Sequence, residues 1–316
     1  MQHINCTEQV AIVAKMLHYV NSRKLICMNS NKIILKHKLD GLTGERLQHL
    51  YDTPSELFYR GTDPSNLLTV PSVAIIGSRK MSAYGRAVTE KLATDLANAG
   101  IVIISGLALG VNSAAHRIAV QSRVPTLAVQ AGGLDTIHPT SHFGLAEQIL
   151  AQGGALVSEY PQGMPPLAHQ FVARNRIIAA LADAVLITEA ALKSGSLHTA
   201  AFALDLGKPV LAVPGPITSS LSAGTNQLIK TGASVVTSVD DILAVLHISK
   251  QDAQQNLFGN NDAESAILAA IGQGVSDGSA MQHESGLSVT EFAQTLTMLE
   301  IQGKIRAIGG DTWTLT

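Results

Sequence analysis

The sequence predicts an α/β protein built on a doubly wound parallel sheet. Three features of the central region lead to this: short β-branched runs that are apolar almost throughout, Gly- or Pro-marked turns after them, and helical stretches after the turns. Continuous apolar runs are typical of parallel strands buried on both faces, and their alternation with helices predicts βαβ units. The 316 residues suggest about two domains, and an apolar content of 46% with 15% charged residues excludes intrinsic disorder.

The predicted strands share this composition and are, in chain order, Val73–Ile76, Ile101–Ser105, Pro125–Gln130, Ala155–Glu159, Ala184–Glu189, Pro209–Val213 and Ser234–Thr237. Helices are predicted between them, among others at Tyr84–Asn98, Ser113–Val120 and Ser141–Ala151. Because crossovers between parallel strands are right-handed, the strand-to-helix turns are expected at one edge of the sheet. Ligands of such sheets bind at that edge.

Four segments are expected along the chain. Residues 1–60 are predicted to form a small helical module, with Val10, Val13, Leu17 and Val20 on one helix stripe. Residues 61–248 hold the sheet, and the polar, unpatterned residues 249–261 are typical of a linker. Residues 262–316 are expected to form a third unit.

The third unit is predicted to contain helices followed by a hairpin. A short helix is expected at Ala266–Ile271, and the capping-box sequence Ser288–Glu291 opens a second helix that runs to Gln302. A Gly-Gly turn then separates two short strands within 304–315. This order of elements is typical of a winged helix.

Charge is distributed unevenly. The whole chain is near neutral at −2, whereas residues 262–316 carry two basic and seven acidic side chains. This balance argues against a tail that holds nucleic acid by charge, and favours contact with protein.

The localisation expected by default is cytoplasmic. No apolar run approaches the roughly 18 residues of a membrane span, so no membrane association is expected. The first residues do not resemble a secretion signal. Cys6 and Cys27 are too few for a disulfide framework, and neither has a basic or His-paired setting that would activate it.

Small residues are concentrated in the turns after the predicted strands. Gly77-Ser78-Arg79, Ser105-Gly106, Gly132-Gly133, Ser194-Gly195-Ser196 and Pro214-Gly215 are examples. Small side chains let backbone N–H groups approach an anion, and the dipole of a following helix adds to the attraction. Several such turns at one edge of a sheet predict a phosphate-binding face.

Arg174, Asn175 and Arg176 follow an aromatic residue, Phe171. Two guanidinium groups beside a ring are able to hold a phosphodiester strand and stack a base. The alternative is a helix start with solvated arginines, which is common on protein surfaces.

Motifs of several enzyme classes are absent from the sequence. No G-x-G-x-x-G or G-x-x-x-x-G-K-[ST] motif occurs, so neither a dinucleotide nor a P-loop nucleotide site is predicted, and no cofactor is expected. Five histidines lack ligand spacing, so no metal site is expected; they are His116, His138, His142, His169 and His198. Glu159 and Glu189 end two strands, either as a carboxylate pair or as acceptors for loop N–H groups. The second role is favoured because no nucleophile or base motif accompanies them.

Taken in order, the motifs over about residues 56–243 resemble the DNA-processing protein DprA (Smf) family. The residues that carry this resemblance are Gly77-Ser78-Arg79, Tyr84-Gly85, Ser105-Gly106-Leu107-Ala108, His116, Gly133-Leu134-Asp135, Pro139, Ser158–Pro161, Arg174–Ile178, Glu189-Ala190, Ser194–Leu197, Thr199-Ala200, Val213–Gly215, Gly224–Asn226 and Gly232-Ala233.

The resemblance implies an extended Rossmann-like domain that binds single-stranded DNA, forms a homodimer and loads the RecA recombinase during natural transformation. The family is not regarded as enzymatic. It implies that Arg79, with Ser78 beside it, binds a backbone phosphate, and that Gly106 belongs to the same face. Phe171, Arg174, Asn175 and Arg176 would line the pocket, and Ser194, Gly195, Ser196 and Thr199 would form a phosphate cradle at a helix start. The last unit resembles the family's winged-helix domain.

Some positions depart from the family pattern. Ala168 and Val172 stand where family members often have Lys and Pro, so phosphate contact should weaken unless Lys193 or His169 substitutes. Gly110-Val111-Asn112 replaces the usual Gly-Ile-Asp. Within the N-terminal module, only Gly41–Gly44 resembles the family's helix-hairpin-helix turn.

A second interpretation is a nucleotide phosphoribohydrolase of the LOG type, which has a related fold. That family carries P-G-G-x-G-T-x-x-E, whose Glu serves catalysis. The matching stretch here is Ser194–Phe202, which places Phe202 at the position of the acid. The non-enzymatic interpretation is therefore preferred.

Overall fold

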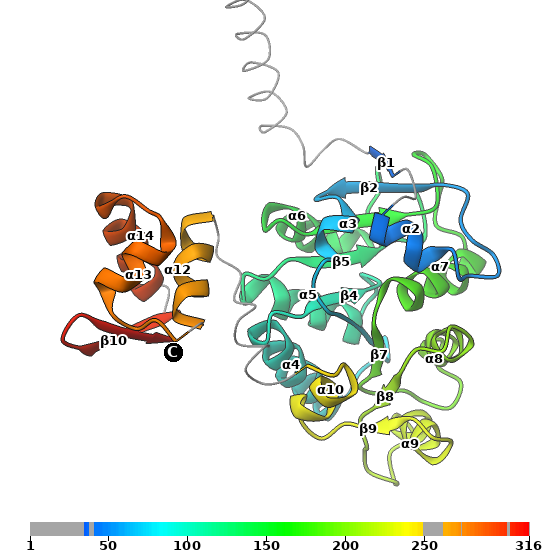
Figure 1. The fold of residues 1–316 in the computed structure, drawn as a ribbon. Helices are drawn as coiled ribbons and strands as arrows, with labels where there is room; N and C mark the ends of the chain where they lie inside the picture. Colours follow the sequence, from blue (N-terminus) through cyan, green and yellow to red (C-terminus); the bar gives the residue numbers. More distant parts are fainter. Residues whose placement is uncertain (1–34, 38–40, 249–261, 273, 302–303, 316) are drawn as a thin grey trace, which may run out of the picture.

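A computed structural model describes residues 35–37, 41–248, 262–272, 274–301 and 304–315 (Figure 1). The predicted N-terminal helix stripe, both cysteines and the predicted linker lie outside these residues. Seven strands run parallel in one sheet: β3 (Ser72–Ile76), β4 (Val102–Ser105), β5 (Thr126–Val129), β6 (Ala155–Ser158), β7 (Ala184–Ile187), β8 (Val210–Ala212) and β9 (Ser234–Val235). Each falls within, or one residue outside, a predicted strand. The α/β class and the parallel sheet are thus confirmed.

The order of strands in the sheet is β1-β2-β6-β5-β4-β3-β7-β8-β9. From β3 the chain moves outward through β4, β5 and β6, then returns to the other side of β3 and continues through β7, β8 and β9. The direction of winding therefore reverses between β3 and β7. In open α/β sheets, a crevice forms at the carboxyl ends of the strands at such a reversal.

Helices cover both faces of the sheet. Val73 and Ile75 of β3 share a core with α4 (Ala83–Asn98), α5 (Val111–Gln121) and α10 (Val239–Val245). Ala74 and Ile76 share the opposite core with α2 (Gly41–Leu47), α3 (Pro64–Leu67), α7 (Ala168–Leu181) and α8 (Ser196–Asp205). Because successive strand residues face opposite layers, both sets must be apolar, which explains the continuous apolar runs.

Two further helices complete these layers. α6 (Phe143–Ala151), which follows a 3₁₀ turn at Thr140–His142, packs on Ala128 of β5 and Leu156 of β6. Leu228 of α9 (Ala223–Lys230) packs against the core that contains α7 and α8.

Two antiparallel strands at one edge of the sheet were not predicted. β1 (Leu35–His37) pairs with β2 (Leu57–Gly61), and β2 pairs with β6, so the proposed boundary after residue 60 falls inside β2. The apolar run of β2 is short because Arg60 interrupts it. That side chain is buried and is bound by tertiary contacts, an ion pair with Glu147 (2.9 Å) and a hydrogen bond to the Leu134 carbonyl (3.2 Å).

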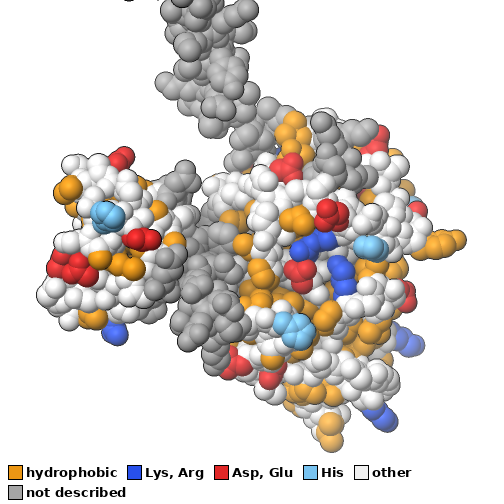
Figure 2. Space-filling view, in the orientation of Figure 1, with side chains coloured by type: hydrophobic (Ala, Val, Ile, Leu, Met, Phe, Trp, Pro, Cys, Tyr) orange, Lys and Arg blue, Asp and Glu red, His pale blue; other side chains and the backbone are white. Residues whose placement is uncertain are grey.

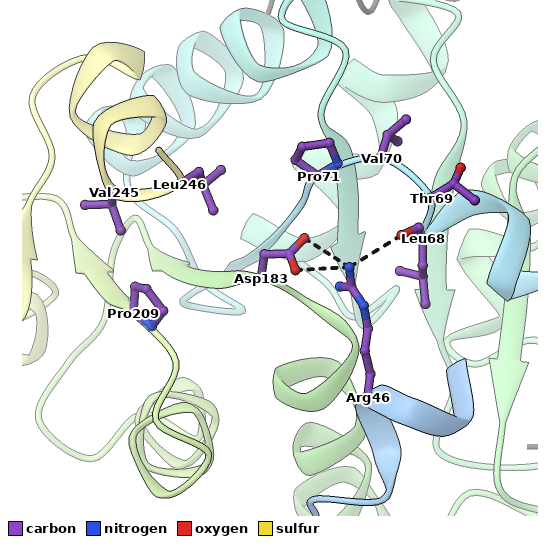
Figure 3. Close-up of a pocket in the computed structure, with 9 residues that line it drawn as sticks. All are labelled: Arg46, Leu68, Thr69, Val70, Pro71, Asp183, Pro209, Val245 and Leu246. Atoms are coloured by element: carbon purple, nitrogen blue, oxygen red, sulfur yellow. Dashed lines mark hydrogen bonds and ion pairs between the residues drawn. The ribbon is translucent and has the colours of Figure 1, made fainter. Parts of the chain in front are cut away.

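Arg46 anchors α2 to the amino-terminal edge of the sheet (Figure 3). Its guanidinium forms an ion pair with Asp183 (3.0 Å) and donates to the Ser72 hydroxyl (3.0 Å) and the Leu181 carbonyl. A hollow of about 410 Å³ lies here, with mostly apolar walls such as Pro71 and Pro209. Its two charged side chains, Arg46 and Asp183, neutralise each other, so it offers no net charge to an anion.

The C-terminal unit contains three helices and a hairpin: α12 (Asp262–Gly272), α13 (Gly278–Ser285), α14 (Val289–Ile301), β10 (Ile305–Gly309) and β11 (Thr312–Leu315). It has a core of its own, which includes Leu268, Met281 and Leu299. The predicted capping box is present, since Ser288 and Glu291 bond each other reciprocally. α13 was not predicted from the sequence.

The surface of the C-terminal unit is acidic. On the face shown in Figure 2, acidic side chains outnumber basic ones on this unit, in line with its sequence charge. Across the helices that the structure describes, none is both long enough and apolar enough to cross a membrane.

Candidate functional site

A pocket of about 520 Å³ opens at the carboxyl ends of β3 and β7, where the winding of the sheet reverses. We call it the strand-end pocket. Its walls come from the turns after β3, β4 and β7, from the starts of α5 and α8, and from the first two turns of α7. The lining residues are Ile76, Gly77, Ser78, Arg79, Lys80, Ala108, Asn112, Phe171, Val172, Arg174, Asn175, Ala191, Lys193, Ser194, Gly195 and Ser196.

Most of the predicted site residues meet in this pocket. The turn after β3 brings Ser78 and Arg79, α7 brings Phe171, Arg174 and Asn175, and the start of α8 brings Ser194, Gly195 and Ser196. Three predicted residues, Gly106, Arg176 and Thr199, are not part of the lining. The structure adds Lys80, Ala108, Asn112, Val172 and Ala191, which were not predicted as site residues from the sequence. Val172 belongs to the predicted Phe-Arg segment, and the others follow the ends of predicted strands.

The strand-end pocket is positively charged. Arg79, Lys80, Arg174 and Lys193 line it, and no Asp or Glu occurs among its described lining residues. Ala168 replaces the lysine that is usual in the family, and two residues are candidates to substitute for that cation. Lys193 lines the pocket, whereas His169 does not. Phosphate oxygens would meet cations here without a competing carboxylate.

Arg174 is a buried cation at the back of the pocket. Its Nη1 donates to the carbonyl oxygens of Gly106 (2.6 Å) and Val129, and only 3% of the residue is exposed. Burial, reinforced by the charge of Arg79, lowers the pKa of Arg174 to about 10. The guanidinium still carries its charge at neutral pH, and its bonds fix its position.

Gly106 accommodates the guanidinium of Arg174. A Cβ atom at residue 106 would lie 2.6 Å from the guanidinium carbon and from both of its terminal nitrogens. Any side chain at this position would push Arg174 from its place. Gly106 thus shapes the pocket from behind, through Arg174.

Phe171 contacts the side chains of Arg79 and His138. The guanidinium carbon of Arg79 lies 5.5 Å from the centroid of its ring, which is within the range of a cation–π interaction. The ring of His138 meets it edge-on, with centroids 5.4 Å apart and planes at 62°. The phenyl ring is half-buried, so part of it remains available to a ligand.

Glu189 positions the turn that carries Ser78 and Arg79. Its carbonyl oxygen accepts from the Ser78 N–H (2.8 Å), and its carboxylate accepts from the Ser82 N–H (2.8 Å) and the Ser82 hydroxyl. Ser82 in turn caps α4 by accepting from the Gly85 N–H (3.0 Å). These contacts are those expected of an acceptor for loop N–H groups.

The start of α8 forms the opposite wall. The hydroxyls of Ser194 and Ser196 are hydrogen-bonded (2.8 Å), and the Asn175 amide donates to the Gly195 carbonyl (3.4 Å). No side chain caps the helix at Gly195, and the positive end of its dipole faces the pocket. Thr199 lies further along the helix and is fully buried.

Arg176 points away from the strand-end pocket. Its Nη2 contacts Glu159 (2.7 Å) and Asp52 (3.3 Å), and only 8% of the residue is exposed. It therefore ties α7 to the end of β6. Two arginines that are separated by one residue on a helix face different surroundings, which the sequence does not reveal.

The histidines give no metal site within the described ranges, where no group of three or more His, Cys, Asp or Glu residues is suitably placed. His116 is buried, with Nδ1 2.9 Å from the Thr126 hydroxyl, and burial lowers its pKa to about 3. The Nδ1 of His142 donates to the carbonyl of Leu107 (2.8 Å), a residue held at φ 50° in the turn after β4. Both histidines support the fold around the pocket.

The fold and site define a doubly wound α/β protein with a cationic pocket at the reversal of its sheet. Residues 38–247 match the family described as DNA recombination-mediator protein A. The chain belongs to this family, the DprA/Smf family predicted from its motifs.

The relatives extend over most of the chain. Protein Smf of Escherichia coli K12 is 41% identical over 268 residues, which is 82% of this chain and 71% of the relative. A putative DNA processing protein DprA of Mycobacterium tuberculosis is 38% identical over 267 residues, covering 82% of this chain and 68% of the relative.

Two solved structures share the fold. The structure of DprA from Streptococcus pneumoniae superposes with a TM-score of 0.62 at 39% identity, covering 72% of this chain and 80% of that protein. DNA processing protein A from Helicobacter pylori, whose structure concerns its single-stranded DNA binding mode, gives a TM-score of 0.61 at 34% identity, covering 69% and 97%.

Proposed function

We propose that this protein binds single-stranded DNA in the strand-end pocket and loads RecA as a recombination mediator, without cleaving the DNA. The observation that carries the proposal is the convergence of Arg79, Lys80, Arg174 and Lys193 on one pocket without a carboxylate in its described lining. The similar protein from Helicobacter pylori binds single-stranded DNA, which supports the same ligand here.

Each part of the pocket suits a part of an unpaired strand. Arg79 is exposed and offers its guanidinium to a phosphate. The buried charge of Arg174, behind it, attracts the same phosphate. Ser194, Ser196 and the start of α8 offer donors to a second phosphate. Phe171 presents a ring on which a base can stack, and the bases of a duplex have no free face for such a contact.

The partners inferred for the protein are those of its family. We infer a homodimer of the sheet domain, RecA as the protein partner and natural transformation as the process. The C-terminal unit, with three helices and a hairpin, fits a winged-helix domain. Its acidic charge favours contact with protein rather than DNA.

The alternative of a LOG-type phosphoribohydrolase lacks its acid. Phe202 occupies the position of the catalytic Glu in that motif, and its side chain packs against the hydrophobic core beneath α8. We therefore expect no release of free base from nucleoside monophosphates above a buffer control. Measurable release would revive the hydrolase interpretation.

A gel-shift series tests the proposal. Wild type, Arg79→Ala and the control Lys91→Ala are titrated with single- and double-stranded oligonucleotides at low and high salt. Lys91→Ala removes an exposed cation of α4 outside the lining of the pocket. We expect a preference for single strands, lost affinity in Arg79→Ala and none lost in the control. Equal affinity for duplex, or an Arg79→Ala variant like wild type at both salts, would overturn it.

A further inference from the structure

A second hollow adjoins the strand-end pocket. It has a volume of about 560 Å³ and lies between α4 and α5, and we call it the α4–α5 groove. Arg79 and Lys80 line both hollows, so the same two cations form the passage from one to the other. The groove continues along the two helices through Arg86 of α4 and Arg117 of α5.

The α4–α5 groove is positively charged along its length. Arg79, Lys80, Arg86 and Arg117 are all exposed. The single carboxylate among its described lining residues belongs to Glu90, which lies 3.7 Å from Arg86 on the same helix. Exposed ion pairs of this kind are weak and exchange readily for a phosphate. Within the described part of the chain, no ion pair occupies Arg117.

Apolar surface accompanies these cations. Leu109 is half exposed in the turn before α5 and lines the groove, as does Met81 before α4. A groove in which apolar side chains lie beside cations suits a single strand, which carries both phosphates and unpaired bases. A duplex has no unpaired bases to place on the apolar residues.

We propose that single-stranded DNA leaving the strand-end pocket continues into the α4–α5 groove, where Arg86 and Arg117 contact its phosphates. The proposal rests on the function inferred above, since the groove is reached through Arg79 and Lys80. On this proposal, the groove increases the number of nucleotides that the protein contacts. A strand that only fills the pocket does not meet Arg86 or Arg117, whereas a longer one meets both.

The test compares two lengths of oligothymidylate, about 5 and about 15 nucleotides, within the range of single-strand sites. Binding to the full chain is measured by fluorescence anisotropy over a series of salt concentrations. The variants are Arg86→Gln, Arg117→Gln and their combination, with Lys91→Ala as the matched control on α4. Circular dichroism checks that each variant is folded. A variant that fails to fold is replaced by the corresponding Met substitution, which also removes the charge but keeps a long apolar side chain.

We expect wild type to bind the long oligonucleotide more tightly and with a steeper salt dependence. Each groove substitution should reduce the slope of log K against log salt by about 0.7 for the long oligonucleotide and leave the short one unchanged. If the double substitution left binding of the long oligonucleotide unchanged, this inference would be overturned, while the proposed function of the strand-end pocket would stand. A wild-type protein that bound neither length would overturn the proposed function as well.

Discussion

The guanidinium of Arg79 lies over the ring of Phe171, with 5.5 Å between the guanidinium carbon and the ring centroid. One residue comes from the turn after β3 and the other from α7, so the sheet reversal brings them together. A nucleotide carries a phosphate, which a cation can bind, and a base, which can stack on an aromatic ring. Their contact holds both in place before a strand arrives.

The first prediction separates these two roles. Arg79→Ala should lower the affinity for single-stranded DNA and flatten its salt slope by about 0.7, because a phosphate contact is lost. Phe171→Leu should weaken binding by about 1–3 kcal/mol with an unchanged slope, because a stacked base is lost and no charge changes. Anisotropy titrations over a salt series measure both. If both variants changed the slope alike, the assignment of roles would be wrong.

The second prediction concerns the space that Gly106 leaves for Arg174. Gly106→Ala should displace the buried guanidinium, destabilise the protein by about 1–3 kcal/mol and weaken DNA binding. Gly144→Ala in α6 is the matched control, since a Cβ there meets nothing within 4 Å. Urea unfolding and DNA titration of both variants provide the measurement. A Gly106→Ala variant as stable as the control would contradict this account.

The third prediction separates stability from binding at the two edges of the sheet. Arg46→Met should lower the free energy of unfolding by about 1–3 kcal/mol, because the carbonyl of Leu181 and the carboxylate of Asp183 lose a charged donor. DNA affinity should stay as in wild type, because the strand-end pocket lies at the opposite edge. Thermal unfolding measures the stability of the variant, and fluorescence anisotropy measures its DNA affinity. A loss of affinity without a loss of stability would refute it.

The fourth prediction is a pH dependence from His116. An unfolded imidazole takes up a proton near pH 6.5, whereas burial lowers the folded pKa of His116 to about 3. Below pH 6.5 only the unfolded state binds this proton, so stability falls toward pH 3 by up to about 1.4 kcal/mol per pH unit. Above pH 6.5 the contribution is fully present.

Between pH 7 and pH 5, the free energy of unfolding of His116→Gln should therefore fall by about 2 kcal/mol less than that of wild type. Urea unfolding at both pH values measures the difference. His49→Gln, which removes an exposed imidazole, is the control. Parallel losses in wild type and His116→Gln would show that His116 does not supply this dependence.

The fifth prediction concerns the acidic C-terminal unit. Removal of residues 262–316 should leave the affinity for single-stranded DNA unchanged, because the unit has its own core and repels phosphate. A gel shift of the shortened and full chains compares the two. A large loss of affinity on deletion would count against protein contact as the role of this unit.

The predicted strands share a physical signal that the remaining elements lack. β3 to β8 are buried on both faces, so their apolar runs identify them without reference to neighbours. β2 contains the charged residue Arg60. Its place in a strand depends on the ion pair with Glu147 and on the pairing of β2 with β6. α13 contains few apolar residues and packs mainly through Met281. Such elements depend on distant contacts that no local pattern shows.

Local sequence patterns were enough to predict the α/β class, the parallel strands in chain order and the turns that hold the candidate binding residues, because burial on two faces and small turn residues leave local patterns. Which arginine of α7 enters the pocket, by contrast, depends on contacts between distant parts of the chain. Arg174 reaches the carbonyls of Gly106 and Val129, whereas Arg176 turns to Glu159. The direction of a side chain depends on partners that are distant in the chain, and these become neighbours only when the sheet winds back at β3.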